Sequence, residues 1–206
     1  MMKTLRFCFA LLLVASMFAP PEASAQTIIG AKAGINIANV TFSGEGVSAS
    51  ADSRTAFVGG AFAQFGIGSP WFIQPEVLYS SKGSKSDDET LKVDYLEVPV
   101  LLGAAFPLSN SALKPMVFAG PSLGIKLSCD EEGFDCSDEV KSVDFAVVFG
   151  GGIQYALSSV VLFLDGRYNL GLTNVAEVEE IAEDFDFSAK NRTWQFMAGV
   201  GFPVGG

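Results

Sequence analysis

Residues 161–172 read VLFLDGRYNLGL, an apolar segment in which Asp165 and Arg167 stand two positions apart. Side chains of a β-strand alternate between two faces, so the leucines share one face and both charges share the other. On a lipid-facing surface, Arg167 would cost about 2–4 kcal/mol near the bilayer midplane. The segment therefore predicts a strand that turns its apolar side chains to lipid and its two charges to the opposite side.

The same alternation recurs along the rest of the chain. The segments that show it are 28–41, 54–67, 71–82, 91–106, 113–127, 140–156, 160–173 and 191–204. Each is longer than the roughly 9–11 residues with which a tilted strand crosses an outer membrane. Helical periodicity is weak except in VAEVEEIAE (175–183), where one or two helical turns are expected inside a connection.

The connections between these segments are alternately long and short. The long ones are 42–53, 83–90, 128–139 and 174–190, and the short ones are 68–70, 107–112 and 157–159. Of the 22 acidic residues that follow position 25, 15 fall in 87–89, 130–139 and 177–186, whereas the short connections carry none. In an up-and-down arrangement all long connections, and with them most of the negative charge, share one side.

These patterns predict an all-β fold, an eight-stranded antiparallel up-and-down transmembrane β-barrel with long extracellular loops and short periplasmic turns. A soluble barrel, which turns its apolar face inward, is the alternative. The mixed face favours the membrane barrel because it holds small residues and isolated charges, whereas a water-facing sheet carries dense Lys, Glu and Thr. Eight strands enclose a space just wide enough for such side chains.

The predicted interior charges are Lys32, Glu76, Glu97, Lys126, Asp144, Asp165 and Arg167. Because an unpaired buried charge is expensive, Arg167 needs carboxylate partners, and barrel geometry suggests Glu76 and Glu97. On the outer surface, aromatic residues towards the strand ends predict interfacial girdles. These residues are Trp71, Tyr79, Tyr95, Tyr155, Tyr168 and Trp194.

Four prolines lie inside predicted strands, namely Pro75, Pro99, Pro115 and Pro121. Proline cannot donate a ladder hydrogen bond, and a closed barrel has no free edge to accommodate it. We expect β-bulges to relieve these positions, with one near Tyr95 and Leu96, where the apolar alternation changes phase.

The first 25 residues predict a cleaved signal peptide, with Lys3 and Arg6 before an apolar core and Ala23-Ser24-Ala25 as the cleavage site. The barrel domain is then 26–206, with 11 basic and 22 acidic residues and a formal charge of −11. A surface this acidic excludes nucleic acid as a partner class. The expected location is the outer membrane of a Gram-negative bacterium, with membrane lipid as the first partner.

The sequence offers little for catalysis or cofactor binding. It contains no His, which excludes a Ser-His-Asp triad and His-based metal sites, so we expect neither an enzyme nor a cofactor. The run 184–188 (DFDFS) alternates oxygen ligands as a calcium loop does, but Ala189 and Gln195 replace the glycine and the acidic residue of that loop. Cys129 and Cys136 predict a disulfide, since the chain is exported and their spacing is not that of a redox motif.

Several motifs resemble the PorT-like outer-membrane β-barrel family, which is common in Bacteroidota. They are GAKAGINIANV (30–40), FIQPEVLYSSKG (72–83), YLEVPVLLG (95–103), FAGPSLG (118–124) and DGRYNLGLTN (165–174). The resemblance covers essentially the whole mature chain. It implies a small antiparallel barrel in the outer membrane and no defined activity.

Three functions are consistent with this architecture. The first is a closed barrel with a filled interior, which has a structural role or binds envelope proteins or extracellular ligands through its acidic loops. The second is a narrow pore for small solutes, which the width of an eight-stranded barrel disfavours. The third is a soluble periplasmic ligand-binding barrel of the lipocalin type.

Overall fold

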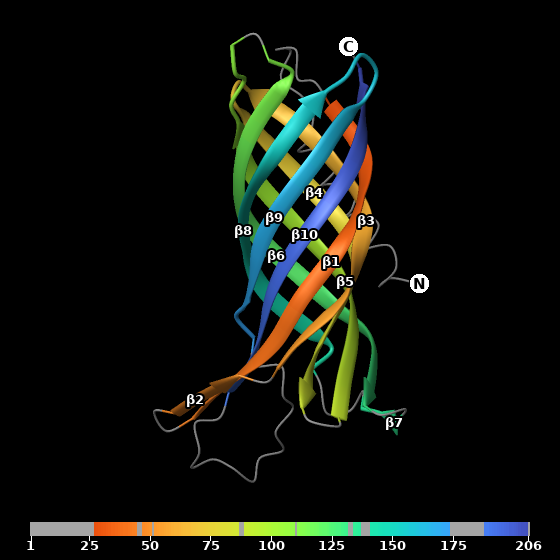
Figure 1. The fold of residues 1–206 in the computed structure, drawn as a ribbon, viewed down its shortest axis with the longest axis vertical. Coiled ribbons are helices and arrows are strands. Elements are labelled where there is room, and N and C mark those ends of the chain that lie inside the picture. Colours follow the sequence, from red (N-terminus) through yellow and green to blue (C-terminus); the bar gives the residue numbers. More distant parts are fainter. Residues whose placement is uncertain are drawn as a thin grey trace, which may run out of the picture.

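The computed structural model describes residues 27–44, 47–50, 52–86, 89–109, 111–131, 134–136, 141–173 and 188–205. Eight long strands form a tall barrel (Figure 1). They are β1 (Thr27–Gly44), β3 (Asp52–Gly68), β4 (Trp71–Ser86), β5 (Glu89–Ala105), β6 (Leu113–Glu131), β8 (Val143–Ala156), β9 (Val161–Gly171) and β10 (Ser188–Val204). Two short strands, β2 (Val47–Ser50) and β7 (Phe134–Asp135), extend β1 and β6 beyond the barrel rim.

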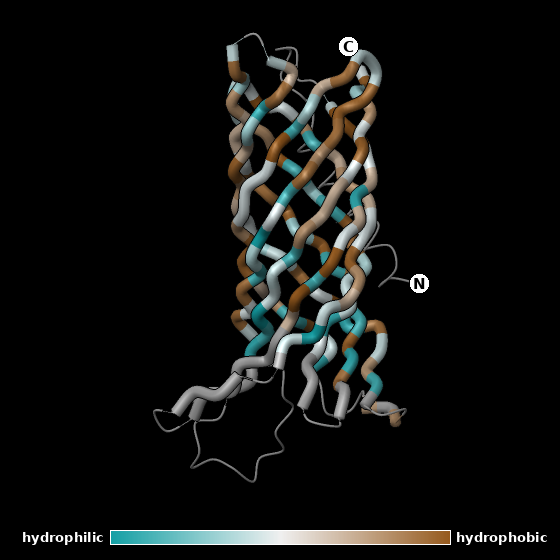
Figure 2. The backbone as a smooth tube through the Cα atoms, viewed as in Figure 1, coloured by the Kyte–Doolittle hydropathy of each residue, from teal (hydrophilic) through white to brown (hydrophobic). Residues whose placement is uncertain are grey.

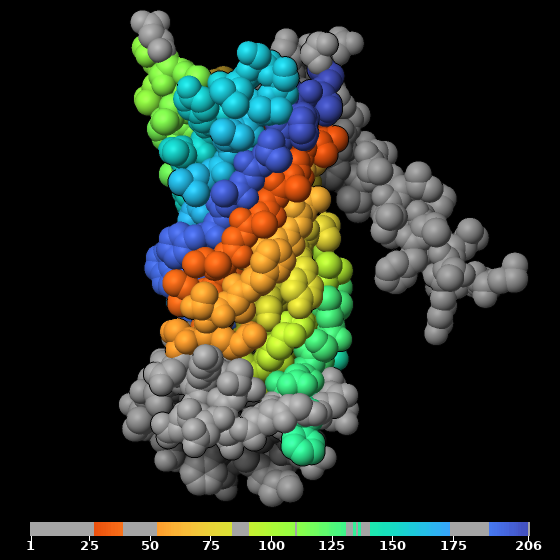
Figure 3. All heavy atoms as spheres, turned by 45° about the vertical axis from the view of Figure 1, so that its right-hand side comes forward, coloured from red at the N-terminus to blue at the C-terminus, as the bar shows by residue number. Residues whose placement is uncertain are grey.

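Each long strand pairs in antiparallel fashion with its neighbours along the chain, and β10 pairs with β1 to close the sheet. The closing seam runs from Thr27 opposite Val204 to Ser43 opposite Ser188. In Figure 3, β10, β1 and β3 lie side by side as oblique bands across the surface. The predicted all-β, eight-stranded antiparallel barrel is therefore confirmed.

The two faces of the strands are the ones that the alternation predicts. On β9, Leu162 and Leu164 are exposed. The buried residues that alternate with the outward ones are Val161, Phe163, Asp165, Arg167, Asn169 and Gly171. Figure 2 shows hydrophobic and hydrophilic residues succeeding one another along the strands. Because large apolar side chains cover the outside and ions lie inside, the lipocalin-type soluble barrel is the wrong alternative.

The aromatic girdle predicted from the strand ends is present with one exception. Trp71, Tyr79, Tyr155 and Trp194 are exposed on the outside, and the half-buried ring of Tyr168 packs against Trp194 with 5.0 Å between ring centroids. Tyr95 instead points into the barrel and is buried. Its position in β5 is in phase with the inward residue Glu97, so its proximity to a strand end gave a wrong prediction of its face.

The strands extend further towards the long-loop end than predicted. β4 and β5 continue through most of the expected loop 83–90, and β6 continues into the expected loop 128–139. The expected loop 42–53 also contains the end of β1, all of β2 and the start of β3. Three predictions fall outside the described residues: the signal peptide, the helical turn in 175–183 and the core of the calcium-like run 184–188. No described segment forms a helix with the length and apolarity that a membrane crossing needs.

The four prolines are accommodated without bulges. Pairing between β4 and β5 is interrupted between Pro75–Val100 and Leu78–Glu97, yet the register is the same on both sides of the gap. A similar gap separates Pro99–Ser122 from Leu102–Ala119 in the β5–β6 pair. Pro75 and Pro99 therefore interrupt the ladder, but neither strand contains an extra residue at these positions. The predicted bulges at the prolines were wrong.

A register shift does occur next to Tyr95, between Asp94 and Tyr95 in their pairing with β6. The shift lies beside the predicted residues, but the extra residue is Leu127 on β6, so the predicted bulge within β5 was wrong. Val93 and Tyr95 point inward and Val100 and Leu102 outward within one continuous alternation. The apolar phase changes because the outer part of the barrel interior is itself lined by apolar side chains.

Candidate functional site

The centre of the barrel holds a cluster of four charged side chains from three strands: Lys32 on β1, Glu76 on β4, and Asp165 and Arg167 on β9. The Arg167 guanidinium donates two hydrogen bonds to the Glu76 carboxylate, at 2.7 and 3.1 Å, and one to Asp165 Oδ2 at 3.2 Å. Lys32 Nζ donates to Glu76 Oε1 at 3.1 Å and to Asp165 Oδ2 at 2.7 Å. Each cation thus contacts both carboxylates, and this central ion cluster is charge-balanced.

Glycines on adjoining strands create the space for this cluster. Arg167 pairs with Gly150 and Asp165 with Gly152 across the β8–β9 ladder, and Lys32 pairs with Gly199 on β10. A Cβ atom at Gly150 would lie 2.7 Å from Arg167 Cβ, and one at Gly199 would lie 2.8 Å from Lys32 Cβ. These glycines therefore leave room for the long charged side chains that lie beside them.

A layer of phenylalanines lies against the cluster. Lys32 Nζ is 4.8 Å from the ring centroid of Phe62, and Arg167 Cζ is 5.2 Å from that of Phe118. Phe62 and Phe163 form an edge-to-face pair with 4.9 Å between centroids. These rings belong to one buried apolar group: Ile28, Phe62, Phe72, Leu101, Met116, Phe118, Val148, Val161 and Phe163. The rings and ions therefore lie against one another inside the barrel.

Three glutamines connect the cluster to the periplasmic mouth. Gln154 Nε2 donates to Gln64 Oε1 at 3.2 Å, Gln64 Nε2 to Gln74 Oε1 at 2.9 Å, and Gln74 Nε2 to Glu76 Oε1 at 2.6 Å. Gln64 and Gln154 also line a pocket of about 390 Å³ that is bordered by the short turns at 69–70 and 157–158. Phe72 and Val161, two members of the buried apolar group, line this pocket as well.

A second polar group lies nearer the extracellular end. Lys82 forms an ion pair with Glu97, whose carboxylate also accepts hydrogen bonds from Asn169 at 3.3 Å and Gln195 at 3.1 Å. Asp144 accepts a hydrogen bond from Asn191 at 2.9 Å. Of the two carboxylates proposed for Arg167, Glu76 is in contact with it, whereas Glu97 contacts Lys82.

Six of the seven predicted interior charges are buried in inward positions: Lys32, Glu76, Glu97, Asp144, Asp165 and Arg167. Lys126 is only partly buried and lies beside the β6 register shift. The sequence interpretation missed Lys82 because it took position 82 as the end of a strand. A usable signal was present, since Lys82 continues the even-numbered inward face of β4 that contains Glu76.

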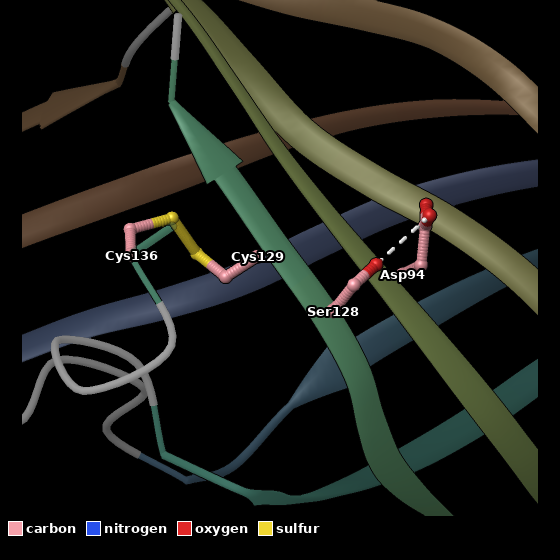
Figure 4. The surroundings of a disulfide bond; sticks show 4 residues. All are labelled: Asp94, Ser128, Cys129 and Cys136. Carbon is pink, nitrogen blue, oxygen red and sulfur yellow. Dashed lines mark hydrogen bonds between the residues drawn. A yellow bond between two sulfur atoms is a disulfide. The ribbon is translucent and has the colours of Figure 1, made fainter. Parts of the chain in front are cut away.

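Cys129 and Cys136 form a disulfide that joins the end of β6 to the segment after β7 (Figure 4). The two cysteines pack with Val93 and Tyr95 in a small buried group. Nearby, Ser128 donates a hydrogen bond to Asp94 at 3.2 Å. The disulfide therefore tethers the β6–β7 extension to the outer end of the barrel, where Phe134 is 77% exposed.

Replacing both cysteines with serine should destabilise this extension more than the barrel. Closing so short a loop constrains the unfolded chain by about 2–3 kcal/mol on the chain-entropy model. We expect faster amide hydrogen exchange and protease cleavage around 129–136, with little change for β9 and β10. Equal acceleration throughout the barrel would contradict a local role for the disulfide.

The chemistry of the interior is electrostatic and structural. Within the described ranges no three His, Cys, Asp or Glu side chains are grouped so that they could hold a metal ion. The buried ions instead pair with one another and accept hydrogen bonds from amide side chains, which lowers the cost of burying charge. The ion pairs and hydrogen bonds connect side chains of β1, β4 and β9 across the inside of the barrel.

Known proteins provide an independent comparison. The family model of the outer membrane protein beta-barrel domain matches residues 8–202. No curated protein matches this sequence. The fold is similar to the crystal structure of OprG from Pseudomonas aeruginosa, with TM-score 0.55, 14% identity and coverage of 91% of this chain and 99% of OprG.

Two further solved structures share this fold. Neisserial surface protein A (NspA) has TM-score 0.52 and 22% identity, with coverage of 85% of this chain and 96% of NspA. The solution structure of outer membrane protein W from E. coli has TM-score 0.51 and 15% identity, with coverage of 89% of this chain and all of that protein. At these identities the likeness concerns the fold alone. With the family match over nearly the whole sequence, this chain belongs to the outer membrane protein beta-barrel domain family and is an integral protein of the Gram-negative outer membrane.

Proposed function

We propose that this protein is a closed outer-membrane barrel that acts through its extracellular end and does not conduct solutes. The observation that supports this most directly is the central ion cluster. Arg167 is 0% exposed and bridges β9 to Glu76 on β4, across the inside of the barrel. A side chain in this position, with the phenylalanine layer beneath it, blocks the path that a pore would need.

The extracellular end carries the features suited to interaction. The connections on that side hold most of the acidic residues of the mature chain, and Phe134 on the disulfide-tethered extension is largely exposed. We propose envelope proteins or extracellular ligands as the partners and a non-enzymatic role. The motifs at 72–83, 95–103 and 165–174 support placing the chain with the PorT-like proteins inside the wider family.

Planar-bilayer recording on the purified protein tests this proposal. We expect no discrete conductance steps, because the ions and rings fill the lumen. A variant with Phe62, Phe118 and Phe163 all replaced by alanine serves as the comparison, since it removes the phenylalanine layer and should raise the ion leak. Step-like conductance of the unmodified protein at a level independent of preparation would contradict the closed barrel and favour the narrow pore.

A further inference from the structure

Two cations continue the lipid-facing side of β10 beyond its aromatic residues. Towards the extracellular end, this face carries Phe202, Val200, Ala198, Phe196, Trp194, Arg192 and Lys190 in turn. Trp194 is 50% exposed, and its ring packs against Tyr168 on β9. The cations therefore follow directly on an aromatic pair of the kind found at headgroup depth.

Among the described residues, the Arg192 guanidinium contacts a backbone carbonyl and no carboxylate. Its Nη1 donates to the carbonyl oxygen of Gly171 at 3.1 Å, and Leu170 lies opposite it in the ladder. Neither Arg192 nor Lys190 forms an ion pair with any residue that the structure describes. Both side chains are partly exposed on the outside of the barrel.

A second basic residue at the same end of the barrel, Lys92, does have a carboxylate partner. Lys92 on β5 forms an ion pair with Asp94 at 3.1 Å, and its side chain is 44% exposed. Asp94 is itself buried among Ser81, Tyr79 and Ser128. Lys92 is thus an exposed cation near the outer rim that already has an anionic partner within the chain, and it is the natural control for Arg192 and Lys190.

We propose that Arg192 and Lys190 bind the phosphoryl group of a phosphorylated glycolipid in the outer leaflet. A guanidinium presents paired donors that match phosphate oxygens, and a neighbouring ammonium adds a second charge. The depth of the site argues for a lipid and not a free anion. Arg192 lies two residues from lipid-facing Trp194 and beside Leu170, so a phosphate that reaches it is expected to be attached to acyl chains.

The test uses Trp194 as a reporter. The chain contains only two tryptophans, so a Trp71→Phe background leaves Trp194 alone. Folded protein in zwitterionic micelles is titrated with bis-phosphorylated lipid A while its fluorescence is recorded. A surface cation contributes about 1 kcal/mol to binding anionic lipid, so Lys190→Gln or Arg192→Gln should weaken binding about fivefold and the double variant about 30-fold.

The matched variant Lys92→Gln should leave the affinity unchanged, and Arg192→Lys should retain most of it. Mobility shifts on unheated gels report that each variant is folded, and if the double variant fails to fold the single ones carry the test. Equal binding of dephosphorylated lipid A, or an equal loss in Lys92→Gln, would overturn the proposal. Displacement of lipid A by millimolar inorganic phosphate would show that a free anion is the ligand and would overturn it too.

Discussion

Replacing Glu76 with glutamine should lower the free energy of unfolding of the barrel by about 3–5 kcal/mol. Glu76 accepts hydrogen bonds from Arg167, Lys32 and Gln74 at 2.6–3.1 Å, and all of these side chains are buried. Glutamine has nearly the same shape but no charge. The substitution would leave Arg167 and Lys32 to share the single carboxylate of Asp165, with one positive charge uncompensated in the interior.

Equilibrium urea unfolding in lipid vesicles, followed by tryptophan fluorescence, measures this effect. Lys92→Gln is the control, because the Lys92 side chain is 44% exposed, and an ion pair with a solvent-exposed partner should contribute about 1 kcal/mol. The double variant Glu76→Leu, Arg167→Leu removes one charge of each sign and keeps the Lys32–Asp165 contact at 2.7 Å. It should therefore recover much of the stability. If Glu76→Gln costs less than Lys92→Gln, the central ion cluster does not hold the barrel together.

Placing an arginine on the outside of β9, the strand that carries Arg167, should cost nearly as much as Glu76→Gln. Leu164 is 56% exposed between the buried residues Phe163 and Asp165, and it lies in the middle of β9. Leu164→Arg would put a guanidinium into hydrocarbon, which costs about 2–4 kcal/mol near the bilayer midplane. The same unfolding assay measures it, so the cost of an inward change on β4 and that of an outward change on β9 can be compared directly.

Phe134→Arg is the matched control for this substitution. Phe134 is more exposed than Leu164, but it lies on β7 beyond the barrel rim, so a charge there should meet water and change stability little. Spin labels at Leu164 and Val200 provide a second readout and should be broadened by lipid-soluble oxygen. An aqueous signal from both labels would mean that the leucine and valine face does not contact lipid.

Much of the fold could be predicted because its determinants are local. The alternation in 161–172 identifies two faces on one strand, and its recurrence with alternating loop lengths identifies the strand order. The inward orientation of Asp165 and Arg167 follows from the same two-residue alternation. A one-residue shift in strand pairing would turn both charges towards lipid and the leucines inward. The error at Tyr95 arose where this local rule was set aside for a position near a strand end.

The partners inside the barrel could be predicted only in part. Barrel geometry suggested both Glu76 and Glu97 for Arg167, and of these only Glu76 contacts it, whereas Glu97 pairs with Lys82. Lys32 and Asp165 are 133 residues apart in sequence, and Arg167 and Glu76 are 91 apart. Which inward side chains meet depends on how far the strands are staggered when the sheet closes. That stagger brings Lys82 to Glu97 and the glutamines of β3, β4 and β8 into one hydrogen-bonded series, and no single segment encodes it.

By itself, the sequence determined which side of each strand meets lipid and that the interior must hold ions, because both follow from a period of two residues and the cost of charge in hydrocarbon. Only the tertiary structure decided how those ions are neutralised, because closure of the β1–β10 seam sets which side chains face each other across the barrel. It also showed that Arg192 and Lys190 remain without an acidic partner among the described residues at the membrane surface.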